Sequence, residues 1–523
     1  MTKLFLRRRQ SSSLLALTLV PAVFLGGHAA AVRAETPPPS SATMLRWEHA
    51  DIAAFRERFL DVDRAFTKET RATAERRLSK LDQANVALSP VDFAIALCRV
   101  AALADNAHTG CLPIPQAQEI CRQFGILDGG TSPGCILSAP DFIVPEANSV
   151  SLRFVPYFGD NFNVVATKAE DSVLLGARVV AVDGRSIESI RTLIRSFHGG
   201  TEARRDLYAA ESLASPDQLR AVGIGRSSAE VSYRFLAAGG QILERTFKAQ
   251  PPDGAPIEWK SIMPADHVSW AFQDHGKAFR WRDAPEINAV VIQLRQNVDA
   301  GDQKIADFLE EVESDRERLG RENIVLDMRF NGGGNFLLTR GFMMRWPARL
   351  SPPGRFFVLT SRNTFSAGIA SIAYLKQAGN ERVVLVGEAP GDRLTFFSEG
   401  RPIQLPHSGL FFSPTTARQD YHTGCRTYDD CFVGVAQPGH PTAPLAVKTT
   451  ETIERIPIEI SSLDPDIKAP WTVDSWLSGT DPAMDAVAAS VVPDDATSTQ
   501  QEHGALNPTP INESMYVRIG AWD

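Results

Sequence analysis

Between residues 285 and 460 the chain alternates short apolar segments with longer amphipathic ones, and this alternation constrains the fold more than any other feature. The apolar segments read INAVVIQLR, NIVLDMR, RFFVLTS and RVVLVGE, and the segments between them include KIADFLEEVESDRERLG and SAGIASIAYLKQAG. Near-continuous apolar strands are typical of a sheet that is covered on both faces, and helices between the strands favour parallel pairing. The sequence therefore predicts an α/β core, which we assign to residues 256–490.

The rest of the chain shows other patterns, and its 523 residues are too many for one ordinary core. In residues 35–145, WEHADIAAFRERFLDVDRAFT and PVDFAIALCRVAALAD repeat apolar residues at helical spacing. Residues 146–255 carry short strand patterns and the phrase RVVAVDGRSIESI, which predicts a strand, a tight Asp-Gly turn and a helix opening at Ser186. Residues 491–523 are polar and predict a loose tail.

The chain begins with the features of a secretory signal peptide. MTKLFLRRRQSSSLLALTLVPAVFLGGHAAAVRAE has a basic start, an apolar stretch and a small-residue exit. We interpret residues 1–34 as this signal, cleaved after Ala34, because Pro21 leaves the apolar run too short and interrupted for a membrane anchor. The Arg-Arg pair also fits twin-arginine export. We expect a periplasmic or secreted protein with no membrane span after cleavage.

The cysteines favour disulfide bonds, because all of them lie in the exported portion and their number is even. Three bridges among six cysteines allow fifteen pairings, and Cys425 and Cys431 form the easiest local pair. A zinc site is the competing interpretation, but the chain has neither C-x-x-C nor H-E-x-x-H, so we expect no metal and no other cofactor. The six residues are Cys98, Cys111, Cys121, Cys135, Cys425 and Cys431.

The charge excludes one class of partner. The formal net charge is -8, so the chain offers no basic face to neutralise phosphates, and we expect no nucleic acid as partner.

Two stretches of the core carry residues suited to acyl transfer. VLDMRFNGGGN ends a buried strand in glycines, whose backbone N–H groups at Gly332 and Gly333 can approach a substrate oxygen as an oxyanion hole does. The alternative is a plain glycine turn. In FSAG, Ser366 stands where a strand gives way to a helix, so it is either an N-cap or a nucleophile aided by the Ala367 amide.

A histidine upstream offers the base that a serine nucleophile needs. His108 lies in LADNAHTGC, a turn-like sequence at the end of the helical region. Its pKa range suits proton transfer near neutral pH. The alternative is an ordinary turn histidine.

Taken together, MRFNGGGN, TFSAG, VVLVGEAPGDR and LDPDIKAPWTVDSWLSGTDPAMDAVAA resemble, in this order, the tail-specific (C-terminal processing) serine peptidase family. The resemblance extends over residues 45–490 and includes a PDZ-like segment around LLGARVVAVDGRSI. It implies a crotonase-like α/β core, Ser366 as the nucleophile, and an oxyanion hole formed by the Gly332-Gly333 turn and the Ala367 amide.

The chain departs from the best-known branch of that family, which activates its serine with a lysine. Arg393 stands at the corresponding place, and a guanidinium cannot act as a base. Lys376 lies ten residues along the helix, about 15 Å from Ser366. The chain is closer to the histidine-using branch, tricorn-like and retinoid-binding-protein-like, because LADNAHT is similar to its L-x-D-x-H-T phrase. The resemblance thus gives the base role to His108.

An acidic residue should orient the imidazole. The resemblance points to Glu399, before the strand that contains LPHSGL, with Glu388 and Asp105 as rivals. Nearby, LTFF stands where relatives have polar residues. His422 is a rival base, and His407 suits a surface turn.

We therefore expect an exported serine-type endopeptidase that cleaves polypeptides through an acyl-enzyme on Ser366, with His108 as general base. The alternative is an inactive family member that serves as a periplasmic peptide- or ligand-binding scaffold, which the LTFF run and the missing lysine motivate. A crotonase-type thioester enzyme would share the core, but the signal peptide argues against a CoA-dependent role.

Overall fold

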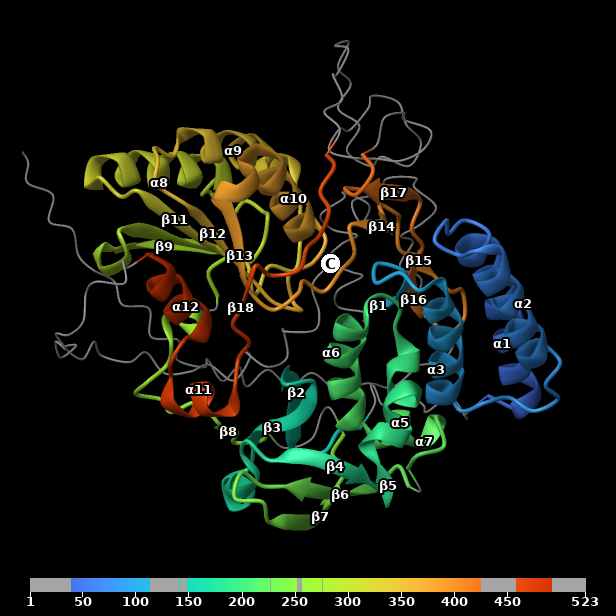
Figure 1. Ribbon diagram of the computed structural model, residues 1–523. Coiled ribbons are helices and arrows are strands. Elements are labelled where there is room, and N and C mark those ends of the chain that lie inside the picture. The colour runs from blue at the N-terminus through green and yellow to red at the C-terminus, as the bar shows by residue number, and fades with distance from the viewer. Residues whose placement is uncertain are drawn as a thin grey trace, which may run out of the picture. The chain divides into compact units, whose positions relative to one another are not determined.

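The computed structural model describes residues 39–112, 141, 148–225, 227–251, 256–274, 276–424 and 458–491. Contacts divide the chain into Met1–Ser40 and Ser41–Asp523, and the second unit is described here (Figure 1). Within the described ranges no helix has both the length and the apolar character needed to cross a membrane.

The helical region predicted near the N-terminus is present. Thr67 and Ser89 cap the second and third helices through their side chains, and Pro90 occupies the first turn of the third, where its missing N–H costs nothing. The elements are α1 (Ser41–Phe55), η1 (Arg56–Leu60), α2 (Lys68–Asp82), α3 (Pro90–Ala101), η2 (Ala102–Ala104) and β1 (Gly110–Leu112).

A second region is built around a mainly antiparallel sheet of order β2-β3-β4-β6-β7, with β5 on β4 and β8 on β3. The predicted Asp-Gly turn is confirmed, since Asp183 and Gly184 both have positive φ between β4 and β5, and Ser186 caps α5. The strands are β2 (Leu152–Phe158), β3 (Asn161–Thr167), β4 (Arg178–Val182), β5 (Arg185–Ser186), β6 (Glu230–Leu236), β7 (Ile242–Lys248) and β8 (Lys260–Ser261). The helices are η3 (Ala169–Leu174), α5 (Ile187–Ile194), η4 (Arg195–Phe197), α6 (Glu202–Leu213) and α7 (Pro216–Ala221).

The predicted α/β core is confirmed as a sheet of order β18-β13-β12-β11-β10-β9. Neighbouring strands from β10 to β18 pair in parallel, and β9 adds an antiparallel edge. Helices α8, α9 and α10 cover one face and α12 the other (Figure 1). The strands are β9 (Phe279–Ala284), β10 (Ala289–Leu294), β11 (Asn323–Asp327), β12 (Phe356–Thr360), β13 (Val383–Gly387) and β18 (Ile467–Lys468). The helices are η5 (Trp270–Phe272), η6 (Pro285–Ile287), α8 (Ile305–Leu319), α9 (Leu337–Arg349), α10 (Ala367–Gly379), η7 (Asn380–Arg382), α11 (Val473–Ser478) and α12 (Pro482–Val491).

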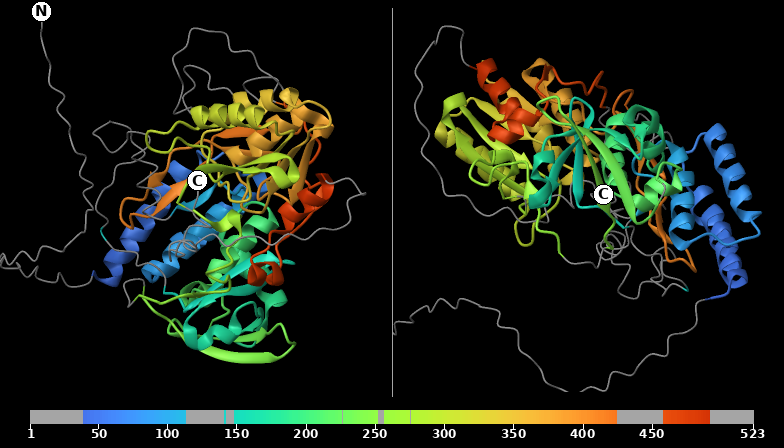
Figure 2. Two further views of the ribbon diagram at one scale, coloured as in Figure 1. Left: turned by 90° about the vertical axis from the view of Figure 1, so that its left-hand side faces the viewer. Right: turned by 90° about the horizontal axis from the view of Figure 1, so that it is seen from below.

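Short strands after β13 join the core to the N-terminal helices. Strand β1 pairs antiparallel with β16, which also pairs with β15, so the chain that follows His108 is hydrogen-bonded to the C-terminal half. Apolar residues of β15 and β16 pack with α1, α2 and α3 in one cluster, and Figure 2 shows these helices beside the strands. The strands are β14 (Thr395–Ser398), β15 (Ile403–Gln404), β16 (Phe411–Ser413) and β17 (Ala417–Asp420).

Candidate active site

Ser366 occupies the N-cap position of α10 in a conformation that a simple cap does not need. Its φ is 53° and its ψ is -119°, and its side chain makes no capping hydrogen bond within the described chain. A positive φ is costly for a residue with a Cβ and persists only where the surroundings enforce it. The hydroxyl is therefore not used to satisfy the first turn of the helix.

Hydrogen bonds to the end of β11 hold this serine turn in place. The Phe365 amide donates to the Asn331 carbonyl at 2.9 Å, and the Thr364 hydroxyl donates to the Met328 carbonyl at 2.8 Å. Because β11 and β12 are parallel neighbours, the loops that leave their carboxyl ends meet at one edge of the sheet. That edge brings the glycine turn to Ser366.

Gly333 lies directly against the serine. A Cβ added to Gly333, whose φ is 121°, would stand 2.7 Å from the Cβ of Ser366 and 3.1 Å from its Oγ. Only glycine leaves the backbone this close to the hydroxyl.

The three predicted oxyanion-hole amides differ in their present partners. The Gly333 N–H donates to Asn331 Oδ1 at 3.0 Å, and the Gly332 N–H donates to the Arg295 carbonyl at 3.3 Å. Ala367 is the first residue of α10, so its N–H has no acceptor within the helix. The amide of Ala367 thus has the position expected of a donor to a developing oxyanion.

Two buried asparagine side chains fix the glycine turn through hydrogen bonds. Asn331 Nδ2 donates to Asn297 Oδ1 at 2.8 Å and to the Leu294 carbonyl at 3.1 Å. Asn297 Nδ2 in turn donates to Thr339 on α9 at 2.8 Å and to Ser371 on α10 at 3.0 Å. The network connects the strand ends to the helix that carries the serine.

A buried cluster of charged side chains holds the chain at the end of β11, just before the glycine turn. Arg329 binds Asp327 and, through two contacts of 2.7 and 2.9 Å, Asp481. Two of the motifs on which the family resemblance rests, MRFNGGG and GTDPAMDAV, are therefore in direct contact.

The turn that carries His108 contacts both the second region, at Gly199 and Gly200, and strand β14. A Cβ on Gly199 would lie 2.6 Å from the Asn106 amide nitrogen, and one on Gly200 would lie 2.7 Å from the Cβ of Ala107. On the core side, Asn106 exchanges two hydrogen bonds with the backbone of Phe397 in β14, at 2.9 and 3.0 Å.

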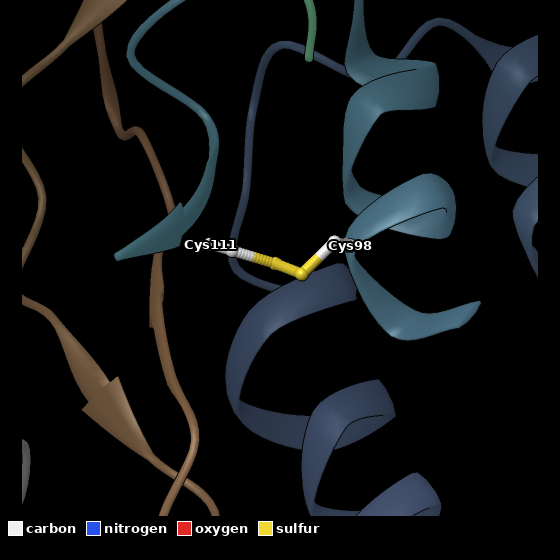
Figure 3. Close-up of a disulfide and its surroundings, with 2 residues drawn as sticks. All are labelled: Cys98 and Cys111. Carbon is white, nitrogen blue, oxygen red and sulfur yellow. A yellow bond between two sulfur atoms is a disulfide. The ribbon is translucent and has the colours of Figure 1, made fainter. Parts of the chain in front are cut away.

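Two further connections secure this turn. Asp63, fully buried, accepts hydrogen bonds from the Thr109 hydroxyl at 2.9 Å and from the Thr415 amide at 2.7 Å. A disulfide joins Cys98 to Cys111, one on each side of His108 in sequence (Figure 3). The remaining cysteines, with the expected Cys425–Cys431 pair, lie outside the described residues.

The His108 imidazole stacks on two phenyl rings, and one of them, Phe365, belongs to the serine turn. Its centroid is 4.3 Å from that of Phe365 and 5.1 Å from that of Phe396, and its side chain is 9% exposed. Burial, with a smaller effect of the Arg204 charge, lowers the pKa of His108 to about 3. Neither ring nitrogen has a hydrogen-bond partner among the described residues, Ser366 included.

Asp392, which the sequence analysis did not single out, is the acid beside this histidine. Its Oδ2 lies 3.6 Å from His108 Nδ1, and its side chain is 2% exposed. Its Oδ1 accepts the Arg393 amide at 2.8 Å, and burial raises its pKa to about 7. The sequence offered one hint of this acid. Asp392 directly precedes Arg393, which stands where the lysine-using branch of the family that the chain resembles has its lysine.

The acids expected from the sequence, Glu399, Glu388 and Asp105, contact residues other than His108. Glu399 follows β14 with φ of 52°, hydrogen-bonded to Ser398, and burial raises its pKa. Glu388 lies 3.4 Å from Arg362, and burial raises its pKa as well. In the described part of the chain, no ion pair or hydrogen bond joins either of them to His108.

Asp105 is half exposed and belongs to a surface ion cluster. It pairs with Arg205 of α6 and, at 3.1 Å, with Arg393, whose guanidinium also donates to the Asp105 carbonyl at 2.7 Å. Arg393 thus binds the His108 turn rather than a reacting group. Of the other histidines considered, His422 binds the Ile460 carbonyl at 3.1 Å, and His407 lies 2.6 Å from Asp141.

Comparison with known proteins gives a structural match only. No family model matches the chain, and no curated protein does. Mature CPAF, a solved structure, is matched over 87% of this chain and 99% of its own, with 13% identity and a TM-score of 0.53. Other matches are the photosystem II D1 C-terminal processing protease (15% identity, 87% and 98% covered, TM-score 0.35) and a putative S41 protease from Bacteroides fragilis (14%, 70% and 87%, 0.29). At such identities the likeness is one of fold, and the chain shares the α/β fold of mature CPAF.

Proposed function

We propose that this protein is an exported serine-type peptidase of the tail-specific family, with a crotonase-like core and a PDZ-like region at residues 146–255. The observation that carries the proposal is the strained serine turn, in which Gly333 lies against Ser366 while the neighbouring residue Phe365 contacts the His108 ring. The CPAF-like fold supports the assignment.

In the proposed reaction His108 removes the proton of the Ser366 hydroxyl as Oγ attacks the substrate carbonyl carbon. The Oγ–C bond forms and the carbonyl oxygen becomes an oxyanion, which receives the Ala367 N–H. The C–N bond then breaks, and the proton on His108 goes to the leaving amine. Water attacks the acyl-enzyme with the same base, releasing the carboxylic acid and restoring Ser366.

The glycine donors of the oxyanion hole require a small rearrangement. The Gly333 N–H would exchange Asn331 Oδ1 for the oxyanion, and the Gly332 N–H would exchange the Arg295 carbonyl. Such donors act without reorganisation only when they already point at the reacting oxygen. We therefore propose the Ala367 amide as the principal donor, with Gly332 and Gly333 as contributors.

For the third residue we propose Asp392, because its carboxylate faces His108 Nδ1 at 3.6 Å. An acid at this nitrogen would stabilise the imidazolium that forms during attack. Glu399, the residue expected from the sequence, is the rival. Asp392→Asn should slow serine labelling more than Glu399→Gln does, and the reverse order would return the role to Glu399.

A polypeptide is the proposed substrate, captured by the PDZ-like region through strand addition. Export follows from the interpretation of residues 1–34 as a signal peptide. Edman sequencing of the protein recovered from the periplasm or medium, with a new N-terminus at residue 35, is the expected result.

The decisive experiment uses a fluorophosphonate probe, which reacts with activated serines. We expect the wild-type protein to be labelled and Ser366→Ala to remain unlabelled, with peptide mapping placing the adduct on Ser366. His108→Ala should lose labelling while still unfolding in one cooperative transition. Well-folded wild type that resists labelling would contradict the hydrolase proposal, and full labelling of His108→Ala would remove His108 as base.

A second candidate function is a binding or scaffold role without catalysis. It is favoured by one observation: His108 makes no hydrogen bond to Ser366 in the described chain, although such bonds are often long before substrate binds. This function predicts an unlabelled wild type that still binds extended peptides.

A further inference from the structure

Two phenyl rings stack on the His108 imidazole. The Phe365 ring is tilted 25° from the imidazole and the Phe396 ring only 8°, so both rings lie nearly parallel to it. Phe365 comes from the turn before α10 and Phe396 from β14, two elements that are both anchored in the core. A flat ring that is covered on both faces cannot tilt without losing contact with one of them.

The edges of the ring show a different situation. Asp392 Oδ2 stands 3.6 Å from Nδ1, beyond the range of a normal hydrogen bond. In the described chain neither Nδ1 nor Nε2 has a hydrogen-bond partner, although the side chain is largely buried, with 9% of it exposed. Buried polar atoms are nearly always satisfied, so a buried imidazole with a free ring nitrogen, next to the turn that carries Ser366, is suited to accept a proton.

We propose that Phe396 and Phe365 are positioning residues that clamp the His108 imidazole between their faces and so set its direction toward Ser366. The inference rests on the proposed hydrolase function and deepens it by naming what orients the base. It also gives a role to the LTFF run, where the family that the chain resembles has polar residues: Phe396 is the third residue of that run.

The clamp also controls the charge of the ring. Asp392 faces its edge, and the guanidinium of Arg204 lies 4.1 Å from the centroid of Phe365. Burial is the larger cause that lowers the pKa of His108, and the Arg204 charge is the smaller one. Faces covered by phenyl rings exclude water, so the resting imidazole is neutral. The same burial makes it a weaker base, so the imidazolium formed in the proposed reaction needs the Asp392 carboxylate beside Nδ1.

The test compares two leucine variants on one strand. Phe396→Leu keeps apolar bulk but removes the flat face against His108. Phe397→Leu is the matched control, because Phe397 is the next residue of β14 and packs against the apolar cluster of the N-terminal helices. Phe396→Tyr keeps the ring and serves as the rescue variant.

Two readouts are needed. We expect Phe396→Leu to lower the fluorophosphonate labelling rate by about 10- to 100-fold, as a misplaced base does. Phe397→Leu and Phe396→Tyr should stay close to wild type. By NMR of the histidine ring, assigned with His108→Gln, the pKa of His108 should lie well below 6.5 in the wild type and rise in Phe396→Leu.

Equal labelling rates and equal His108 pKa values in the two leucine variants would overturn the clamp. So would a wild-type His108 that titrates near 6.5, a result that needs no variant to fold. A wild type that is never labelled contradicts the proposed hydrolase instead, and the pKa comparison then still decides whether the rings enclose His108.

Discussion

The serine turn shows how one residue is held in a conformation that it would not adopt alone. Ser366 has a positive φ, and the residue before it is hydrogen-bonded to Asn331 while Gly333 packs on its side chain. Strain of this kind costs on the order of 1–3 kcal/mol and is found where function requires it. The environment of the hydroxyl therefore depends on the absence of a side chain at Gly333.

Gly333→Ala tests this dependence. The new Cβ would lie 2.7 Å from the Cβ of Ser366, so the serine must move, and we expect labelling to fall about 100-fold. Gly240→Ala is the control, because Gly240 also has positive φ but open space around it. Fluorophosphonate labelling rates measure the effect, and equal rates in the two variants would disprove the close contact.

Asp392 gives a prediction about pH. Burial raises its pKa from 3.8 to about 7, so the folded protein holds this proton to a higher pH than the unfolded chain does. The contribution to stability is complete below about pH 4 and is lost as the pH rises through about 7. In Asp392→Asn the side chain is neutral throughout, so the free energy of unfolding should fall less than that of wild type between about pH 4.5 and 8.

Urea unfolding across this pH range measures the difference. The control is Asp302→Asn, because Asp302 is exposed in the loop before α8. Parallel pH curves for wild type and Asp392→Asn would show that the carboxyl is not buried as described.

At the scale of elements, the end of β11 is held by a residue that lies about 150 positions later in the chain, just before α12. Arg329, just after β11, is buried and bound by Asp327 and by Asp481, which directly precedes α12. The guanidinium also lies 4.8 Å from the centroid of the Trp471 ring. This cluster ties the start of α12 to the chain just before the glycine turn.

Asp481→Ala should therefore be strongly destabilising. It leaves part of a buried guanidinium uncompensated, a change that typically costs about 3–5 kcal/mol. The measurement is the urea unfolding midpoint, with exposed Asp302→Ala as the control. Matching midpoints for the two variants would mean that Asp481 contributes no more than a surface charge.

At the scale of the whole unit from Ser41 onward, Asp63 joins segments that lie far apart in sequence through hydrogen bonds. It accepts hydrogen bonds from Ala65, Thr109 and Thr415, and it is fully buried. Through these bonds the N-terminal helices, the His108 turn and the segment after β16 share one anchor.

Asp63→Ala should release the histidine turn. It leaves several buried donors without an acceptor, each costing about 1–3 kcal/mol, and we expect both lower stability and slower labelling of Ser366. Asp61→Ala is the control, since Asp61 is exposed two residues earlier. If labelling survives in Asp63→Ala, the turn does not need this anchor.

By itself the sequence determined the parts that depend on local pattern. The apolar strands, the amphipathic helices between them and the Asp-Gly turn follow from spacing within a few residues. The adjacency of the glycine turn and Ser366 was expected only from the family resemblance, and its physical basis, the parallel pairing of β11 with β12, comes from the structure.

The tertiary structure decided what surrounds His108. That His108 lies on Phe365, that Asp392 rather than Glu399 faces its Nδ1, and that Phe396 covers its other face all arise from contacts between distant segments. Strand pairing of β1 with β16 and burial of Asp63 bring those segments together. Periodicity describes which face of an element is buried but not which distant side chain it meets, so only packing could decide which side chains lie around His108.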